Sequence, residues 1–227
     1  MKIGILNCGH PPPGMVPDED GYDRLFADLL EGQDFEFASW DVVDMDFPEG
    51  PDAADGWLIT GSKHGAYDDL PFIPPLEELI RAIMAANRPL VGICFGHQII
   101  AQAMGGEVRK WEHGWAVGHS EYDWAGETIT LNAWHQDQVA KRPADAKLLA
   151  TSTFCENAAL LYGDKAFTVQ AHPEFGERQV DCLVTTRAPG LVPPEKIERA
   201  KTLLKRPNDS HRLAEMIGHF FRHRSPQ

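Results

Sequence analysis

The fold of this 227-residue chain is decided by the stretch Leu90-Val91-Gly92-Ile93-Cys94-Phe95-Gly96-His97-Gln98. Its first four residues form a continuous apolar run, which is typical of a central parallel strand that is covered on both faces. The residues from Cys94 to Met104 predict a helix, which ends at two glycines. The cysteine therefore lies where a buried strand turns sharply into a helix. This context indicates a nucleophile elbow, a turn that raises one side chain above the edge of the sheet.

Two glycines flank this cysteine, each two residues away. We expect a Cβ atom at Gly92 or Gly96 to collide with the neighbouring strand or helix. The dipole and the free amides of the helix N-terminus stabilise a thiolate at Cys94. The amide of Phe95 would then point at the oxyanion that forms when the thiolate attacks a carbonyl group. A small buried core cysteine would also fit this pattern, so the interpretation depends on the rest of the chain.

Strand and helix patterns alternate along the sequence and predict an α/β fold, with a mostly parallel central sheet and helices on both faces. Apolar runs predict strands at residues 3–6, 35–43, 56–60, 90–93, 148–151, 158–162 and 166–171. Apolar residues at helical spacing predict helices at residues 22–30, 76–84 and 94–104. Aromatic, glycine and β-branched residues between positions 107 and 139 predict a small antiparallel insertion. A helical extension is expected over about residues 190–227, with Asp209 or Ser210 as the N-cap of its last helix.

Length and composition predict one domain that spans residues 1–227. The chain has no long Gly/Ser-rich or charge-rich linker, and 43% of its residues are hydrophobic. Its formal net charge of −13 disfavours nucleic acid and anionic membrane surfaces as partners. No apolar run approaches the roughly 20 residues that span a bilayer. We therefore expect neither nucleic-acid nor membrane binding.

The cellular compartment is predicted from the N-terminus and the cysteines. The apolar run at the N-terminus is interrupted at Asn7-Cys8-Gly9-His10, too early for a secretory signal peptide. The four cysteines lie far apart and form no CxxC pair, so free thiols are expected rather than disulfides. Both observations indicate a cytoplasmic protein.

A second chemical motif lies at the end of a later strand. The run 166–171 leads directly into His172-Pro173-Glu174. In an extended segment residues i and i+2 face the same way, so Glu174 can accept a hydrogen bond from the ring of His172. Such a carboxylate fixes the tautomer of the imidazole and leaves its other nitrogen for a thiol. The tripeptide alone would suit a surface turn, but together with Cys94 it predicts a catalytic triad.

These two motifs, in this order and at this separation, resemble those of the class I (triad-type) glutamine amidotransferases. The resemblance implies a flavodoxin-like fold in which Cys94 is the nucleophile, His172 the general acid and base, and Glu174 its orienting partner. It also implies that the amides of Phe95 and Gly61 form the oxyanion hole.

The same resemblance implies which residues bind the substrate. Gln98 matches the family position whose side chain approaches the amino-acid head group of the substrate. Ser62 and His135 lie in stretches, residues 60–72 and 134–139, that are similar to free-standing members of the family. These members include GMP-synthase-glutaminase-like proteins and γ-glutamyl peptidases. For His135, a structural hydrogen-bonding role fits equally well.

The resemblance implies hydrolysis of the γ-amide of glutamine through a γ-glutamyl thioester, with release of ammonia. Too few residues follow Glu174 for a synthetase domain, so a separate partner subunit would have to accept the ammonia. Otherwise the enzyme would hydrolyse γ-glutamyl peptides such as glutathione-like compounds. Two further alternatives are a cysteine α/β-hydrolase, in which the acid normally precedes the histidine, and a catalytically silent regulatory subunit.

No cofactor or metal is expected. Gly4-Ile5-Leu6-Asn7-Cys8-Gly9 lacks the third glycine of a dinucleotide fingerprint, and Gly61-Ser62-Lys63 lacks the upstream glycine of a phosphate loop. The remaining histidines do not have metal-ligand spacing such as HExxH.

Overall fold

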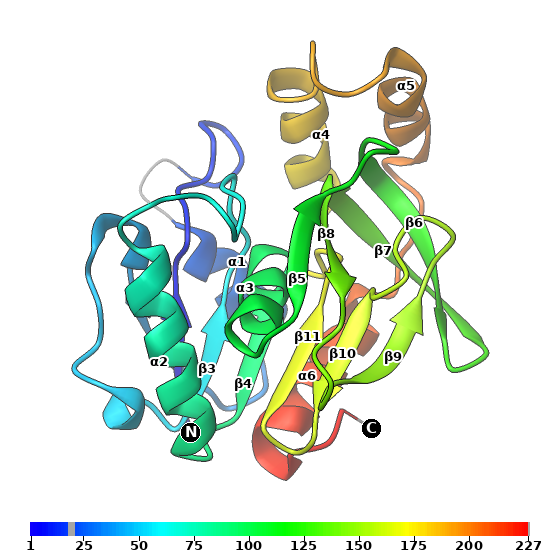
Figure 1. Cartoon of the computed structure of the whole chain (residues 1–227). Helices are drawn as coiled ribbons and strands as arrows, with labels where there is room; N and C mark the ends of the chain where they lie inside the picture. The colour runs from blue at the N-terminus through cyan, green and yellow to red at the C-terminus, as the bar shows by residue number, and fades with distance from the viewer. Residues whose placement is uncertain (18–20, 227) are drawn as a thin grey trace.

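The computed structural model describes residues 1–17 and 21–226, and its centre is a nine-stranded sheet (Figure 1). The spatial order of the strands is β2-β1-β3-β4-β11-β10-β9-β6-β7. Their bounds are β1 Lys2–Leu6, β2 Glu36–Trp40, β3 Gly56–Ile59, β4 Leu90–Ile93, β6 Ala116–Trp124, β7 Glu127–His135, β9 Lys147–Thr151, β10 Ala159–Tyr162 and β11 Ala166–Val169. The first five strands in this order are parallel, whereas the others pair antiparallel. The predicted α/β class with a parallel centre is therefore confirmed.

Six α-helices accompany the sheet in the described part of the chain. They are α1 Tyr22–Leu29, α2 Ile73–Ala85, α3 Phe95–Ala103, α4 Glu177–Thr186, α5 Pro194–Leu203 and α6 Ser210–His223. The C-terminal helices thus begin at Glu177, earlier than the expected boundary near residue 190. In Figure 1, α4 and α5 lie at the upper end of the sheet, whereas both chain termini lie at its lower end.

The region between residues 107 and 139 is antiparallel, as expected, but it is divided between two sheets. Strands β5 (Glu107–Lys110) and β8 (Asp137–Lys141) form a separate two-stranded sheet. The longer hairpin β6–β7 extends the main sheet instead, because β6 pairs with β9 at Asp123 and Trp124. The expected small insertion is therefore present as β5–β8, and the rest of the region becomes the edge of the main sheet.

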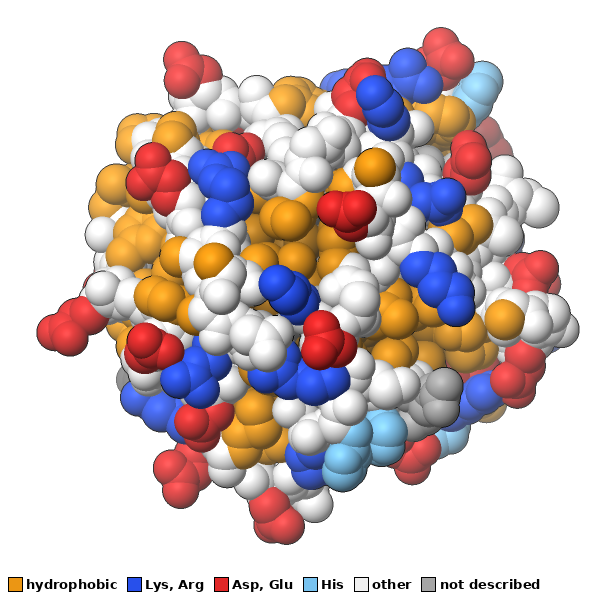
Figure 2. Space-filling view, turned by 60° about the horizontal axis from the view of Figure 1, so that its bottom comes forward, with side chains coloured by type: hydrophobic (Ala, Val, Ile, Leu, Met, Phe, Trp, Pro, Cys, Tyr) orange, Lys and Arg blue, Asp and Glu red, His pale blue; other side chains and the backbone are white. Residues whose placement is uncertain are grey.

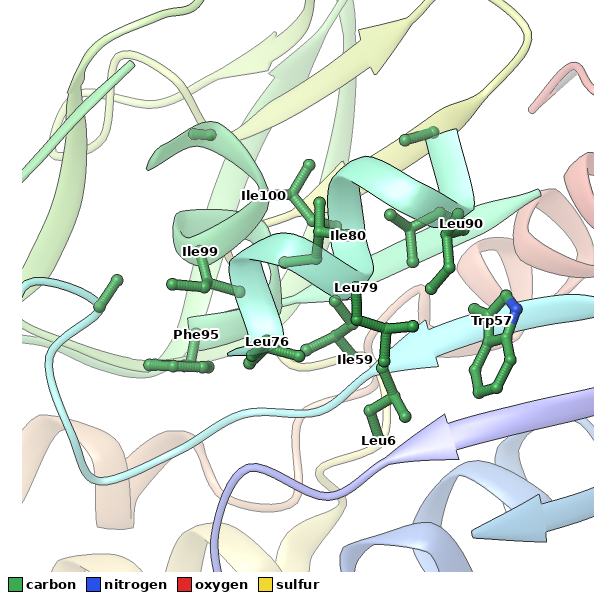
Figure 3. Packing of buried hydrophobic residues seen from close by; sticks show 14 of the residues in the cluster. Leu6, Trp57, Ile59, Leu76, Leu79, Ile80, Leu90, Phe95, Ile99 and Ile100 are labelled. Atoms are coloured by element: carbon green, nitrogen blue, oxygen red, sulfur yellow. The ribbon is translucent and has the colours of Figure 1, made fainter. Parts of the chain in front are cut away.

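Alternating residues of the parallel strands fill two hydrophobic cores, one on each face of the sheet. Figure 3 shows Leu6, Trp57, Ile59 and Leu90 beneath side chains of α2 and α3, all of them buried. The residues between them, including Ile5, Leu58 and Val91, pack on the opposite face against α1 and α6. Side chains of successive strand residues point to opposite faces, so one short apolar strand can contribute to both cores. Helices on both faces were predicted and are confirmed.

Asp209 precedes α6 as predicted, but its carboxylate does not cap that helix. Its Oδ2 accepts hydrogen bonds from Thr130, at 2.7 Å from the backbone nitrogen and 2.9 Å from the hydroxyl oxygen. The expectation of a side-chain cap is thus wrong, because a strand neighbour competes for the same carboxylate. The predicted cap residue instead connects α6 to β7.

Charged side chains of both signs are interspersed on the face shown in Figure 2, which is the lower end of Figure 1 turned forward. Hydrophobic side chains lie between them, and neither sign of charge forms one large patch on this face. Among the described helices, none is long and apolar enough to cross a membrane.

Candidate active site

Three neighbouring parallel strands bring the predicted catalytic residues to one edge of the sheet. Strands β3, β4 and β11 lie side by side, and Gly61, Cys94 and His172 follow their carboxyl ends. Ligands of open α/β sheets bind at this edge, because the loops after parallel strands converge there. The strand order therefore brings together residues that are far apart in the sequence.

Cys94 has the backbone geometry of a nucleophile elbow. Its φ of 54° and ψ of −102° lie in a region that L-residues rarely adopt, directly before α3. A Cβ at Gly92 would come within 2.6 Å of the backbone of Gly96, and one at Gly96 would collide with the carbonyl oxygen of Ile59. The expected reason for both glycines is thus confirmed. Phe95 is the first residue of α3, so its amide has no carbonyl partner within the helix.

His172 and Glu174 form a buried hydrogen-bonded pair. Nδ1 of His172 lies 2.7 Å from Oε1 of Glu174, and both side chains are at most 4% exposed. A carboxylate can only accept, so Nδ1 carries the proton and Nε2 is left as the free nitrogen. Nε2 is buried and has no hydrogen-bond partner among the described residues. Burial lowers the pKa of His172, but the charges of Cys94 and Glu174 outweigh burial and raise it above its ordinary value.

The turn that carries His172 is held by β7 and by an aromatic ring. The amide of His172 donates to the carbonyl of Asn132, and the side chain of Asn132 donates to the carbonyl of Phe175, both at 2.8 Å. The ring of Phe175 stacks on the imidazole at 4.0 Å with an angle of 4° between the planes. These contacts fix the orientation of the histidine ring.

Gly61 lies directly against both predicted catalytic side chains. A Cβ atom at this position would be 3.0 Å from Cε1 of His172 and 3.8 Å from Cβ of Cys94. The sulfur of Cys94 is 4.0 Å from the carbonyl oxygen of Trp134, a long contact for a thiol donor. Catalytic hydrogen bonds are often long before a substrate is bound. Cysteine, histidine and the Gly61 backbone therefore surround one small space in which a carbonyl carbon can be attacked.

Gln98 lies beside this space, and a second glutamine, which was not predicted from the sequence, lies next to it. Nε2 of Gln98 donates to the carbonyl of Asp137 at 2.8 Å and to Oε1 of Gln170 at 3.1 Å. Nε2 of Gln170, a fully buried residue, lies 3.8 Å from the sulfur of Cys94. The sequence did contain a signal for Gln170, because it precedes His172 by two residues in an extended segment.

Ser62 and His135 both line the pocket, but their polar atoms are already engaged. The hydroxyl of Ser62 donates to the carbonyl of Cys8 at 2.6 Å and accepts from the amide of His64 at 3.1 Å. Nδ1 of His135 lies 3.3 Å from the carbonyl of Asp137, and burial lowers the pKa of this histidine to about 3. His135 is thus a neutral, buried wall residue at pH 7.

The pocket above Cys94 has a volume of about 390 Å³, within the range of small-molecule sites. Gly61, Ser62, Gln98, His135 and His172 line it together with Cys94. Glu174 and the ring of Phe95 are buried behind these residues. Leu183 of α4, with Arg187 and Leu191 after it, also contributes to the wall. The C-terminal helices are therefore part of the site.

Comparisons with known proteins match this geometry. Residues 40–185 match the family model described as glutamine amidotransferase class-I. Gamma-glutamyl peptidase 4 of Arabidopsis thaliana is 30% identical over 223 residues, which cover 91% of this chain and 89% of that protein. The glutamine-hydrolyzing GMP synthase subunit of Methanothermobacter thermautotrophicus is 39% identical over 116 residues, covering 44% and 61%. A glutamine amido transferase structure from Methylobacillus flagellatus has a TM-score of 0.75 at 24% identity, covering 98% and 94%.

Proposed function

Because the chain belongs to the class I glutamine amidotransferase family, we propose that it hydrolyses γ-glutamyl amide bonds with Cys94, His172 and Glu174 as its catalytic triad. The observation that supports this most directly is the buried His172–Glu174 pair beside Cys94. Its 2.7 Å hydrogen bond leaves Nε2 of the imidazole without a partner in the described structure. An orphaned buried nitrogen is costly unless it exchanges a proton with a neighbouring group.

The reaction proceeds in two halves. His172 takes the thiol proton, and the sulfur of Cys94 attacks the γ-carbonyl carbon to form a tetrahedral oxyanion, which the amides of Phe95 and Gly61 stabilise. His172 then returns the proton to the leaving nitrogen, the C–N bond breaks, and a γ-glutamyl thioester remains. Water attacks this thioester while His172 accepts its proton. Glutamate leaves, and the thiol is regenerated.

The mechanism applies to two classes of substrate. With glutamine the leaving group is ammonia, which a separate synthetase subunit would consume. With a γ-glutamyl peptide the leaving group is an amino acid or peptide. The peptidase relative matches about nine-tenths of both chains, whereas the GMP synthase subunit matches less than half of this chain. That difference in coverage favours testing γ-glutamyl peptides beside glutamine.

A single substitution tests this proposal. Cys94→Ala removes the nucleophile, so hydrolysis of glutamine, glutathione and γ-glutamyl dipeptides should fall by at least about 1,000-fold. The measurement is ammonia or amino-acid release with all substrates in parallel, with circular dichroism to verify the fold. Cys182→Ala is the matched control, since this cysteine lies on α4 and its thiol faces the carbonyl of Pro13. A Cys94→Ala variant with wild-type turnover would show that the proposed mechanism is wrong.

A further inference from the structure

Two buried glutamine side chains form a chain of hydrogen bonds that ends at the sulfur of Cys94. It begins at the carbonyl of Asp137, the first residue of β8, which accepts from Nε2 of Gln98 at 2.8 Å. The same nitrogen donates to Oε1 of Gln170 at 3.1 Å, and Nε2 of Gln170 lies 3.8 Å from the sulfur. Gln98 is 3% exposed and Gln170 is fully buried.

The backbone carbonyl at the start of this chain determines the orientation of both amides. A carbonyl oxygen can only accept, so the amino end of Gln98 has to face Asp137. That amino group has a second N–H, which faces Gln170, so the end of Gln170 that meets it has to be the carbonyl oxygen. The amino end of Gln170 then points at Cys94.

The reversed orientation of Gln170 is unfavourable at both ends. It would place two amino groups against each other at the contact with Gln98. It would also place a carbonyl oxygen against the sulfur, where it would repel a thiolate. Because both amides are buried, neither can compensate by bonding to bulk water.

From this geometry we propose that Gln170 is a positioning residue that holds an N–H donor against Cys94 and so favours the thiolate form of the nucleophile. A hydrogen bond to the charged form of a group stabilises that form, and bonds to ions are stronger than bonds between neutral groups. The inference rests on the proposed function only in taking Cys94 as the nucleophile. Gln170 and His172 approach this sulfur from the same segment, the donor and the proton acceptor two residues apart.

The test measures the thiol rather than turnover. The rate of Cys94 alkylation by iodoacetamide is followed against pH, and the adduct is located by mass spectrometry. Gln170→Leu removes the donor, so the midpoint of the alkylation profile should rise by about one to two pH units. Gln170→Glu, which keeps the shape but places a carboxylate near the sulfur, should raise it at least as much. Having two variants guards against the failure of one to fold.

Gln138→Leu is the matched control, because Gln138 is also a buried glutamine at 3% exposure. Its Nε2 donates to the carbonyl of Phe154 at 3.0 Å and not to the sulfur. A purely structural role for Gln170 predicts that its variants and this control behave alike. An unchanged midpoint in folded Gln170 variants, or an equal shift in the control, would overturn the inference. Failure of the proposed function would look different: turnover would survive Cys94→Ala.

Discussion

Cys94 is held in a strained backbone conformation by three hydrogen bonds. A non-glycine residue in such a region costs about 1–3 kcal/mol, and the surrounding structure has to offset that cost. The amide of Cys94 donates to Val169, its carbonyl accepts from Gln98, and the amide of Gly96 donates to Thr60, at 2.9 to 3.1 Å. The strain therefore persists because strands β3, β4 and β11 meet at this turn.

His97, the third residue after the turn begins, should make the protein sensitive to acid. It is completely buried, its Nδ1 lies 2.8 Å from the hydroxyl of Thr168, and burial lowers its pKa to about 3. Between pH 6.5 and 3 the unfolded chain binds a proton at this residue and the folded protein does not, so stability falls as the pH falls. From pH 7 to pH 5 the loss should be roughly 2 kcal/mol for this histidine alone.

Urea unfolding at pH 7 and pH 5 checks this expectation. In His97→Leu the difference in unfolding free energy between the two pH values should shrink by about that 2 kcal/mol, whatever the absolute stability of the variant. Replacing the exposed His113 with leucine is the control and should leave the difference unchanged. The same pH difference in wild type and His97→Leu would contradict the assignment of a neutral buried imidazole.

At the scale of elements, α6 depends on a single carboxylate for its connection to the antiparallel half of the sheet. The helix buries Leu213, Ile217 and Phe220 on the face that it shares with α1. Its position relative to β7 is fixed by Asp209, whose Oδ2 accepts two hydrogen bonds from Thr130. The contact thus couples the C-terminal helix to the strand that also holds the His172 turn.

Asp209→Ala should therefore destabilise the protein by about 1–3 kcal/mol, because the buried donors of Thr130 lose a charged partner. The measurement is the midpoint of urea unfolding at pH 7. Asp145→Ala is a suitable control, since this aspartate is exposed and its carboxylate has no hydrogen bond to other described residues. Equal stability of the two variants would mean that the Asp209 contact contributes nothing.

For the molecule as a whole, the arrangement of the cores supports the proposal that residues 1–227 form one domain. The central strands contribute to both hydrophobic clusters, and α6, near the C-terminus, packs in the same cluster as β1. Neither end of the chain has a core of its own. Calorimetry should thus give one transition with equal calorimetric and van't Hoff enthalpies. Tryptophan fluorescence and far-ultraviolet circular dichroism should follow the same curve, and two separable transitions would refute the one-domain proposal.

Much of this structure could be predicted from the sequence, because it depends on neighbouring residues. The apolar run before Cys94 predicted a buried parallel strand, and the flanking glycines predicted the turn whose crowding the structure shows. The spacing of His172 and Glu174 along an extended segment predicted their hydrogen bond. Hydrophobic periodicity and side-chain alternation are local properties, so they can be read from short windows of sequence.

Contacts between distant segments were decided only by the tertiary structure. Hairpin β6–β7 joins the main sheet through β9, the segment after α4 contributes Arg187 to the pocket wall, and Gln170 meets the sulfur of a cysteine 76 positions away. Asp209 likewise binds a strand 79 positions away rather than its own helix. The sequence by itself thus determined the nucleophile turn, the His172–Glu174 pair and the fold class. Which side chains surround that turn depends on the order of the strands, because only this order brings such distant residues within hydrogen-bonding distance.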